Sequence, residues 1–111
     1  MIKDLKDKGF ALVTRAHNAH LGTRSYAEHM ALGEFYEALD GKVDEIVETY
    51  QGCFGMIASQ DEGVKEAIRE LANWVAANKE AIAKDNEIIE NQLDELGAIF
   101  AKAHYKLEFL K

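Results

Sequence analysis

The sequence predicts an all-α domain, built as a four-helix bundle. Its 111 residues contain no proline, and the stretches between the glycines are rich in Ala, Glu, Lys and Leu, which are strong helix formers. Strand-forming residues never alternate with polar ones over a useful window, so helix is the expected state along the chain. Apolar residues make up 48% of the chain, enough for one core without disulfides or a structural metal. We therefore expect residues 1–111 to form a single domain.

The first helix is expected from about residue 2 to about residue 21. Gly22 provides a plausible left-handed stop at its C-terminal end. The apolar residues that recur at helical spacing along this segment are Ile2, Leu5, Leu12, Val13 and Ala16, with Phe10 near the margin.

The second helix begins with a capping box, in which the side chains of Ser25 and Glu28 can each satisfy the other's exposed backbone N–H. Gly41 lies inside this helix and costs about 1 kcal/mol against alanine, which a long helix tolerates. The segment from Gly52 to Ser59 holds two glycines among apolar residues, and we interpret it as a packed connector that buries Cys53 as a small hydrophobe. The apolar stripe of the helix is Leu32, Phe35, Tyr36, Leu39, Val43, Ile46, Val47 and Tyr50.

Two further helices complete the predicted bundle. Asp61, or Ser59 with Glu62, is expected to open the third helix, and Asp85 to cap the fourth. Four amphipathic helices with short connectors are typical of a bundle; a helical hairpin joined to a coiled-coil dimer would leave the stripe of the second helix uncovered. The buried side of the third helix is predicted as Val64, Ala67, Ile68, Leu71, Trp74 and Val75. The fourth carries a heptad seam of Ile89, Leu93, Leu96, Phe100, Ala103, Leu107 and Leu110.

Charge and hydropathy exclude two classes of partner. The net charge of −7 and the pI near 5.0 disfavour nucleic-acid binding, which needs a basic face. Lys3, Lys6 and Lys8 alternate with Asp4 and Asp7, a mixed helix surface and not a basic arm. No stretch approaches the roughly 20 apolar residues of a membrane span, and no signal peptide is visible. We therefore expect a cytoplasmic protein with neither nucleic acid nor membrane as partner.

The first half of the sequence carries the residues that could bind a metal ion. His17 and His20 lie one turn apart at the end of the first helix, and His29 lies in the first turn of the second. Asp44 and Glu48 share one face near the end of that second helix. Imidazole and carboxylate groups together are the ligands of iron, zinc and manganese sites.

Helix length decides how these side chains could meet. His29 and Asp44 are fifteen residues apart on one helix, hence about 22 Å apart along its axis, so they cannot bind one ion within a chain. If two copies of the helix cross antiparallel about a two-fold axis near residues 37–38, His29 of one copy lies beside Asp44 and Glu48 of the other. His17 can join from the same chain as His29. The Glu-x-x-His pattern of di-iron sites inside one bundle is absent from this sequence.

At this spacing the residues resemble the Dps-like miniferritins. That family has a His, a second His twelve residues on, an Asp fifteen further on and a Glu four further, and His17, His29, Asp44 and Glu48 fall at those intervals. The family's HWN is similar to His17-Asn18 without the Trp, and its D-x-x-A-E-R to the segment 44–49. Phe35 and Tyr36 are similar to the family's aromatic residues in the second helix.

The resemblance implies a ferritin-like four-helix bundle with a ferroxidase centre between two subunits. Fe(II), or Zn or Mn in its place, would bind His17 and His29 of one chain and Asp44 and Glu48 of the other. Dioxygen or a peroxide would oxidise the iron, for iron storage or peroxide detoxification, with no catalytic residue beyond the metal ligands. A homodimer or larger homo-oligomer follows.

The sequence departs from the family at three points. Gly33 stands where the family often has a further acid, the chain is shorter, and the basic amino-terminal tail that binds DNA is missing. Two other functions remain open. Arg15-x4-His20 and Arg24-x4-His29 fit the R-x4–6-H motif of the HEPN ribonucleases, in which His acts as a base and Arg stabilises phosphate. A non-catalytic helical dimer or adaptor with a degenerate metal site is the other.

Overall fold

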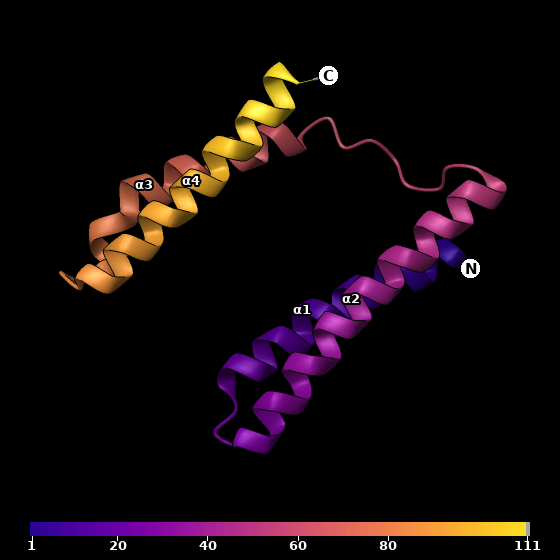
Figure 1. The fold of residues 1–111 in the computed structure, drawn as a ribbon, viewed down its shortest axis with the longest axis horizontal. Helices are drawn as coiled ribbons and strands as arrows, with labels where there is room; N and C mark the ends of the chain where they lie inside the picture. Colours follow the sequence, from indigo (N-terminus) through magenta and orange to yellow (C-terminus); the bar gives the residue numbers. More distant parts are fainter. Residues whose placement is uncertain (111) are drawn as a thin grey trace. The chain divides into compact units, whose positions relative to one another are not determined.

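The computed structural model describes residues 1–110, which contain four α-helices and no strand (Figure 1). The helices are α1 (Ile2–Gly22), α2 (Tyr26–Phe54), α3 (Val64–Ala83) and α4 (Glu87–Phe109). The predicted all-α class with four helices is therefore confirmed. None of the four combines the length and the apolar character needed to cross a membrane.

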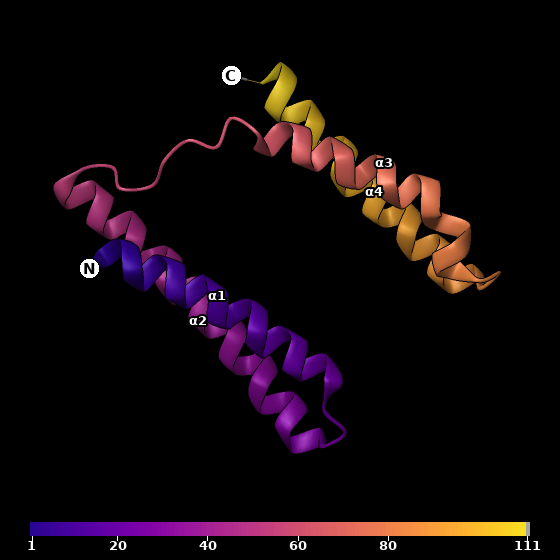
Figure 2. The ribbon, with the colours of Figure 1, turned by 180° about the vertical axis from the view of Figure 1, so that it is seen from behind.

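The helices pair into two compact units. The first hairpin (Met1–Ser59) contains α1 and α2, and the second hairpin (residues 60–110) contains α3 and α4. In both views of the molecule α1 lies alongside α2, and α3 alongside α4, each pair running antiparallel (Figures 1 and 2).

Small residues form the seam of the first hairpin. Gly9, Ala16, Val43 and Val47 are its buried positions. A Cβ added at Gly9 would lie 2.8 Å from Cγ2 of Val43, so α1 approaches α2 as closely as a glycine allows. Several larger apolar side chains of the two helices stay exposed, among them Leu5 at 44% and Leu12 at 43%.

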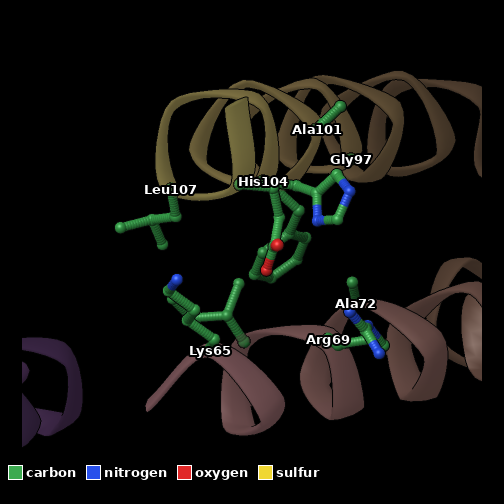
Figure 3. A pocket seen from close by; sticks show the side chains of 10 residues that line it. Lys65, Arg69, Ala72, Gly97, Ala101, His104 and Leu107 are labelled. Carbon is green, nitrogen blue, oxygen red and sulfur yellow. The ribbon is translucent and has the colours of Figure 1, made fainter. Parts of the chain in front are cut away.

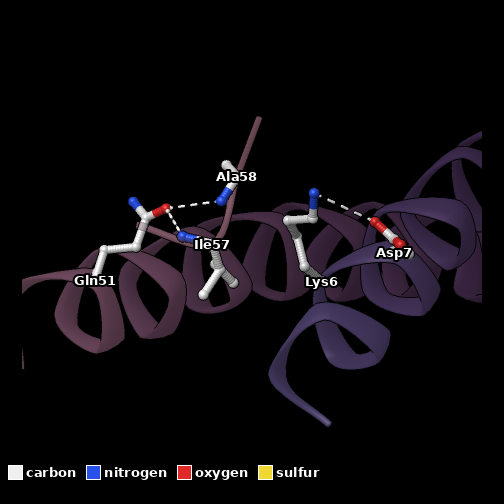
Figure 4. Close-up of polar contacts among 5 residues, drawn as sticks. All are labelled: Lys6, Asp7, Gln51, Ile57 and Ala58. Carbon is white, nitrogen blue, oxygen red and sulfur yellow. Dashed lines mark hydrogen bonds and ion pairs between the residues drawn. The ribbon is translucent and has the colours of Figure 1, made fainter. Parts of the chain in front are cut away.

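The start of α1 carries the mixed charge pattern that the sequence predicts. The amino group of Met1 pairs with Asp4 at 3.3 Å, and Lys6 pairs with Asp7 at 3.4 Å (Figure 4). Of the three lysines of this segment, Lys6 is thus paired with an acid, and Asp4 instead pairs with the terminal amino group.

Ser25 caps α2, as predicted. Its Oγ accepts from the backbone N–H of Glu28 at 3.2 Å. The return contact differs from a capping box, because the backbone N–H of Ser25 donates to Oγ1 of Thr23 at 3.1 Å. A hydrogen bond within the connection, residues 23–25, thus takes the place of the return contact from Glu28.

The predicted packed connector is wrong in both its start and its burial. Helix α2 runs on through Gly52 to Phe54 and ends at Gly55, whose φ of 105° is a conformation that suits glycine. Oε1 of Gln51 then accepts from the backbone N–H groups of Ile57 and Ala58, both at 3.1 Å, and holds the chain that leaves the helix (Figure 4).

The side chains around this helix end face solvent. Phe54 and Met56 are each 77% exposed, and Cys53, expected as a buried hydrophobe, is exposed too. Since Gly52 lies in a helical turn, it provides no break that would fold these apolar residues inward.

The second hairpin begins and turns at different residues from those predicted. Helix α3 starts only after Gly63, whose N–H donates to Oδ1 of Asp61 at 2.9 Å. Asn86, not Asp85, caps α4 by accepting from the N–H of Ile89 at 3.1 Å. Asp85 has a φ of 65°, and such a turn residue cannot also adopt the extended backbone that an N-cap requires.

The α3–α4 seam is looser than the α1–α2 seam. Val75 and Ala83 of α3 are its buried side chains. Lys79 of α3 bridges to Asp94 of α4 at 2.7 Å. Of the seven predicted heptad positions of α4, the last two, Leu107 and Leu110, are exposed. The first five are half-buried: Ile89, Leu93, Leu96, Phe100 and Ala103.

Candidate metal centre

Two histidines contact each other across the turn that connects α1 and α2. The rings of His20 and His29 stack with centroids 3.7 Å apart and planes inclined by 20°. Nδ1 of His20 lies 2.6 Å from the backbone oxygen of His29, and Nδ1 of His29 lies 2.9 Å from the backbone oxygen of His20. Both residues are half-buried. The contact is therefore reciprocal, and we refer to His20 and His29 as the histidine pair.

These hydrogen bonds determine where the protons sit. A carbonyl oxygen only accepts, so Nδ1 of both His20 and His29 must carry hydrogen. In a neutral imidazole the other nitrogen, Nε2, then keeps its lone pair. Histidines that ligate metals characteristically donate their second ring N–H to a carboxylate or a backbone carbonyl in this way. The local geometry thus prepares each Nε2 as a potential ligand.

The histidine pair also stabilises the hairpin itself. The carbonyl of His20 belongs to the last turn of α1, where carbonyl groups lack a partner within the helix. The ring of His29 supplies that partner from the first turn of α2. Each such bond contributes on the order of 1 kcal/mol.

The structure gives a steric reason for the glycine at position 33 that the sequence does not reveal. A Cβ at this position would lie 3.1 Å from Cε1 and 3.3 Å from Nδ1 of His20. Any larger residue at position 33 would therefore press on the His20 ring. The position at which the resemblance leads one to expect an acid is thus the position against which His20 rests.

His17 joins the pair through aromatic contacts. Its ring stacks on Tyr36 with centroids 4.3 Å apart and planes inclined by 14°, and it lies 6.1 Å from the ring of His20. Tyr36 also meets His20 edge-on at 5.5 Å. His17, His20, His29 and Tyr36 therefore form one histidine cluster, to which α1 and α2 each contribute two residues.

The two predicted carboxylate ligands lie elsewhere on α2. Asp44 and Glu48 are both exposed, and because α2 is a continuous helix, Asp44 is about 22 Å along the axis from His29. Within residues 1–110 neither carboxylate forms an ion pair or a side-chain hydrogen bond. The same part of the chain contains no group of three metal-ligating side chains. A single chain thus brings the histidines together and leaves the carboxylates apart.

The cation nearest in sequence to Asp44 is already engaged. Nζ of Lys42 donates to Glu45 at 2.8 Å, and this hydrogen bond, together with the lysine's charge, lowers the pKa of the Glu45 carboxyl. Lys42 is therefore not the partner of Asp44 or Glu48.

The arginines of the alternative ribonuclease motif are exposed. Arg15 and Arg24 form no ion pair or side-chain hydrogen bond with residues 1–110. The histidines of that motif, His20 and His29, are the two that bond to each other's backbone.

His20 is the histidine of this cluster that the predicted metal site did not include. It stands five positions before Ser25, and His29 stands four after it. In an antiparallel hairpin with a three-residue connection, positions nearly equidistant from the turn face each other. That symmetry is the sequence signal that pairs the two histidines.

A family model described as a family of unknown function (DUF5856) matches residues 20–107. The matched stretch includes the histidine pair, Asp44 and Glu48, and it begins three residues after His17. No curated protein and no solved structure gives a significant match.

Proposed function

We propose that this chain, which belongs to the DUF5856 family, is a Dps-like iron protein that binds and oxidises Fe(II) between two subunits. The observation that carries the proposal is the state of His29. Its Nδ1 donates to the carbonyl of His20, which leaves Nε2 free to bind a metal. Asp44 and Glu48 add exposed carboxylates on the same helix, without partners in residues 1–110.

A two-fold axis would complete the site. When two copies of α2 cross antiparallel near residues 37–38, His29 of one chain meets Asp44 and Glu48 of the other, and the same contact is repeated on the opposite side of the axis. His17 belongs to the same histidine cluster as His29, so it would approach the ion from that chain. Because His29 and Asp44 are about 22 Å apart within one chain, such a dimer would hold two separate sites.

The ligand set suits iron. Two imidazole nitrogens with two carboxylates match the donors that Fe(II), Mn(II) and Zn(II) accept. Oxidation with peroxide balances when two Fe(II) ions each give one electron to one H2O2, which takes up two protons and leaves as two waters. Iron is the substrate of this reaction, and the side chains hold it and balance its charge.

Subunit mixing tests the proposal directly. We expect His29→Ala and Glu48→Gln each to abolish Fe(II) oxidation, measured as the rise of Fe(III) absorbance after peroxide is added. A mixed dimer of these two variants contains one site with both changes and one with neither. After 1:1 subunit exchange, about a quarter of the wild-type activity should therefore return.

Glu45→Gln is the matched control, because it makes the same change three residues from Glu48 and outside the ligand set. It should leave oxidation at the wild-type rate. Two inactive variants that stay inactive when mixed would contradict a site between subunits. Absence of Fe(II) binding in an anaerobic titration of a wild-type dimer would replace the metal proposal by a non-catalytic helical dimer.

A further inference from the structure

The second hairpin contains a cavity that the iron proposal does not use. It lies between α3 and α4 and has a volume of about 350 Å³, within the range of roughly 300–1,000 Å³ typical of small-molecule sites. Figure 3 shows Lys65 and Arg69 on α3 and His104 and Leu107 on α4 bordering the same space.

The floor of this cavity is apolar. Ile68 and Phe100 are half-buried there, with Ala72 and Ala101 beside them. Gly97 leaves the space open, since a Cβ at that position would meet nothing within 4 Å. The gap thus arises because small residues on both helices face each other without filling it.

The rim of the cavity carries basic side chains. Lys65 and Arg69 stand one turn apart on α3, and His104 faces them from α4. Glu108 is the only acid among the lining residues. Arg69 has one acidic contact, to the exposed Glu66 at 3.7 Å, a long ion pair that contributes little. The lining thus carries two cations and one acid, a net positive charge in a chain whose own net charge is −7.

The cavity is distinct from the most exposed apolar side chains in the middle of the same hairpin. Leu71, Trp74 and Ile99 are all more than half exposed, and none of them lines the cavity. At about 100° per residue, Trp74 points to the side of α3 opposite Lys65. A helix that covered the Trp74 face would therefore leave the cavity open for a different occupant.

We propose that this cavity binds a small monocarboxylate with an apolar tail, its carboxylate held by Lys65 and Arg69 and its tail lying over Ile68 and Phe100. The pairing of an apolar floor with a cationic rim selects this chemistry over a neutral or a cationic amphiphile. Charge-assisted hydrogen bonds from Arg to carboxylate are the stronger kind, so the rim contributes both affinity and orientation.

Decanoate is the probe that tests the proposal, titrated into the full chain below its micellar concentration and followed by calorimetry and by the methyl NMR signals of Ala72, Ala101 and Leu107. We expect decanoate to bind and to shift these signals. Decan-1-ol and decyltrimethylammonium, which have the same tail, should bind at least about tenfold more weakly, as the loss of charged hydrogen bonds implies.

Three variants sharpen the test. The double variant Lys65→Gln/Arg69→Gln should weaken decanoate binding about tenfold or more. Gly97→Leu should abolish binding because its side chain fills the cavity, and it should fold because the position is free of neighbours. Lys102→Gln removes one cation of α4 outside the cavity and should bind decanoate as the wild type does. Equal affinity for all three amphiphiles, no decanoate binding, or unchanged binding by Gly97→Leu would each overturn the proposal.

Discussion

The two hairpins share a topology, yet glycine acts oppositely in them. In the first hairpin Gly9 brings α1 against Val43, where even a Cβ would come within 2.8 Å. In the second hairpin Gly97 faces open space and forms part of a cavity wall. Glycine therefore allows a close helix contact in the first hairpin and leaves a space open in the second.

The polar contacts across the two interfaces differ in the same sense. In the first hairpin they are half-buried and reciprocal, between the rings and carbonyls of His20 and His29. In the second hairpin the contact is a solvent-exposed ion pair between Lys79 and Asp94. A tight seam can keep imidazoles in one tautomer, whereas a loose seam leaves room for a ligand.

Substituting the two glycines gives the largest expected effect. Gly9→Leu should destabilise the first hairpin by a net of about 2 kcal/mol, because overpacking costs up to about 3 kcal/mol and helix propensity returns about 1 kcal/mol. Gly97→Ala should instead stabilise the second hairpin by about 1 kcal/mol. Urea unfolding followed by circular dichroism measures both changes.

The signs of these two stability changes test the difference between the helix interfaces. If Gly9→Leu is neutral, α1 can move away from α2 at no cost and the close approach is not what holds the hairpin. If Gly97→Ala is destabilising, the space beside α4 is already filled.

Much of the fold could be predicted because helix periodicity and caps are local. The first helix was expected at about 2–21 and spans Ile2–Gly22, and the cap at Ser25 was identified from four consecutive residues. The predicted end of the second helix was wrong because two glycines, Gly52 and Gly55, are close together and either could end the helix. The φ of 105° at Gly55 distinguishes the stop, and the hydrogen bonds from Ile57 and Ala58 to Gln51 that follow it join residues six and seven positions apart.

The candidate site was predictable in part for a related reason. The spacing along α2 shows that His29 and Asp44 cannot meet in one chain, and the continuous helix bears this out. The pairing of His20 with His29 depends on the three-residue connection and on the register that Gly9 and Val43 set between the helices. Such register is a property of two segments together, so no single stretch of sequence contains it.

Removing the His20 ring is expected to have an intermediate effect. His20→Ala deletes one hydrogen bond and the stack on His29, and should cost on the order of 1 kcal/mol. The bond from Nδ1 of His29 to the carbonyl of residue 20 remains, so His29 should keep its tautomer. Long-range ¹H–¹⁵N correlation spectra should show the neutral His20 and His29 of the wild type protonated at Nδ1.

His104, exposed on α4 in the other hairpin, is the matched control. His104→Ala should leave stability unchanged within about 0.5 kcal/mol. Wild-type spectra in which His20 and His29 are protonated at Nε2 would contradict the reciprocal bonds and, with them, the readiness of His29 to bind a metal.

The smallest expected effect concerns one exposed ion pair in each hairpin. The two ion pairs are lost at opposite ends of the pH range. The hydrogen bond to Asp94 raises the pKa of Lys79 above 10.5, so its stabilisation is present below that pH and is lost as pH rises through the folded-state pKa. The hydrogen bond from Lys42 lowers the pKa of Glu45 below 4.5, so its stabilisation is present above that pH and is lost as pH falls.

Thermal unfolding across pH should resolve the two pairs. Asp94→Asn should lower the melting temperature slightly at neutral pH and not at all once Lys79 is deprotonated. Glu45→Gln should do so at neutral pH and not at strongly acidic pH. Both pairs are exposed, so both effects should shrink in 1 M salt. An effect of Asp94→Asn that persists unchanged at high salt would mean that Asp94 holds α4 by packing and that the loose seam of the second hairpin is tighter than its ion pair suggests.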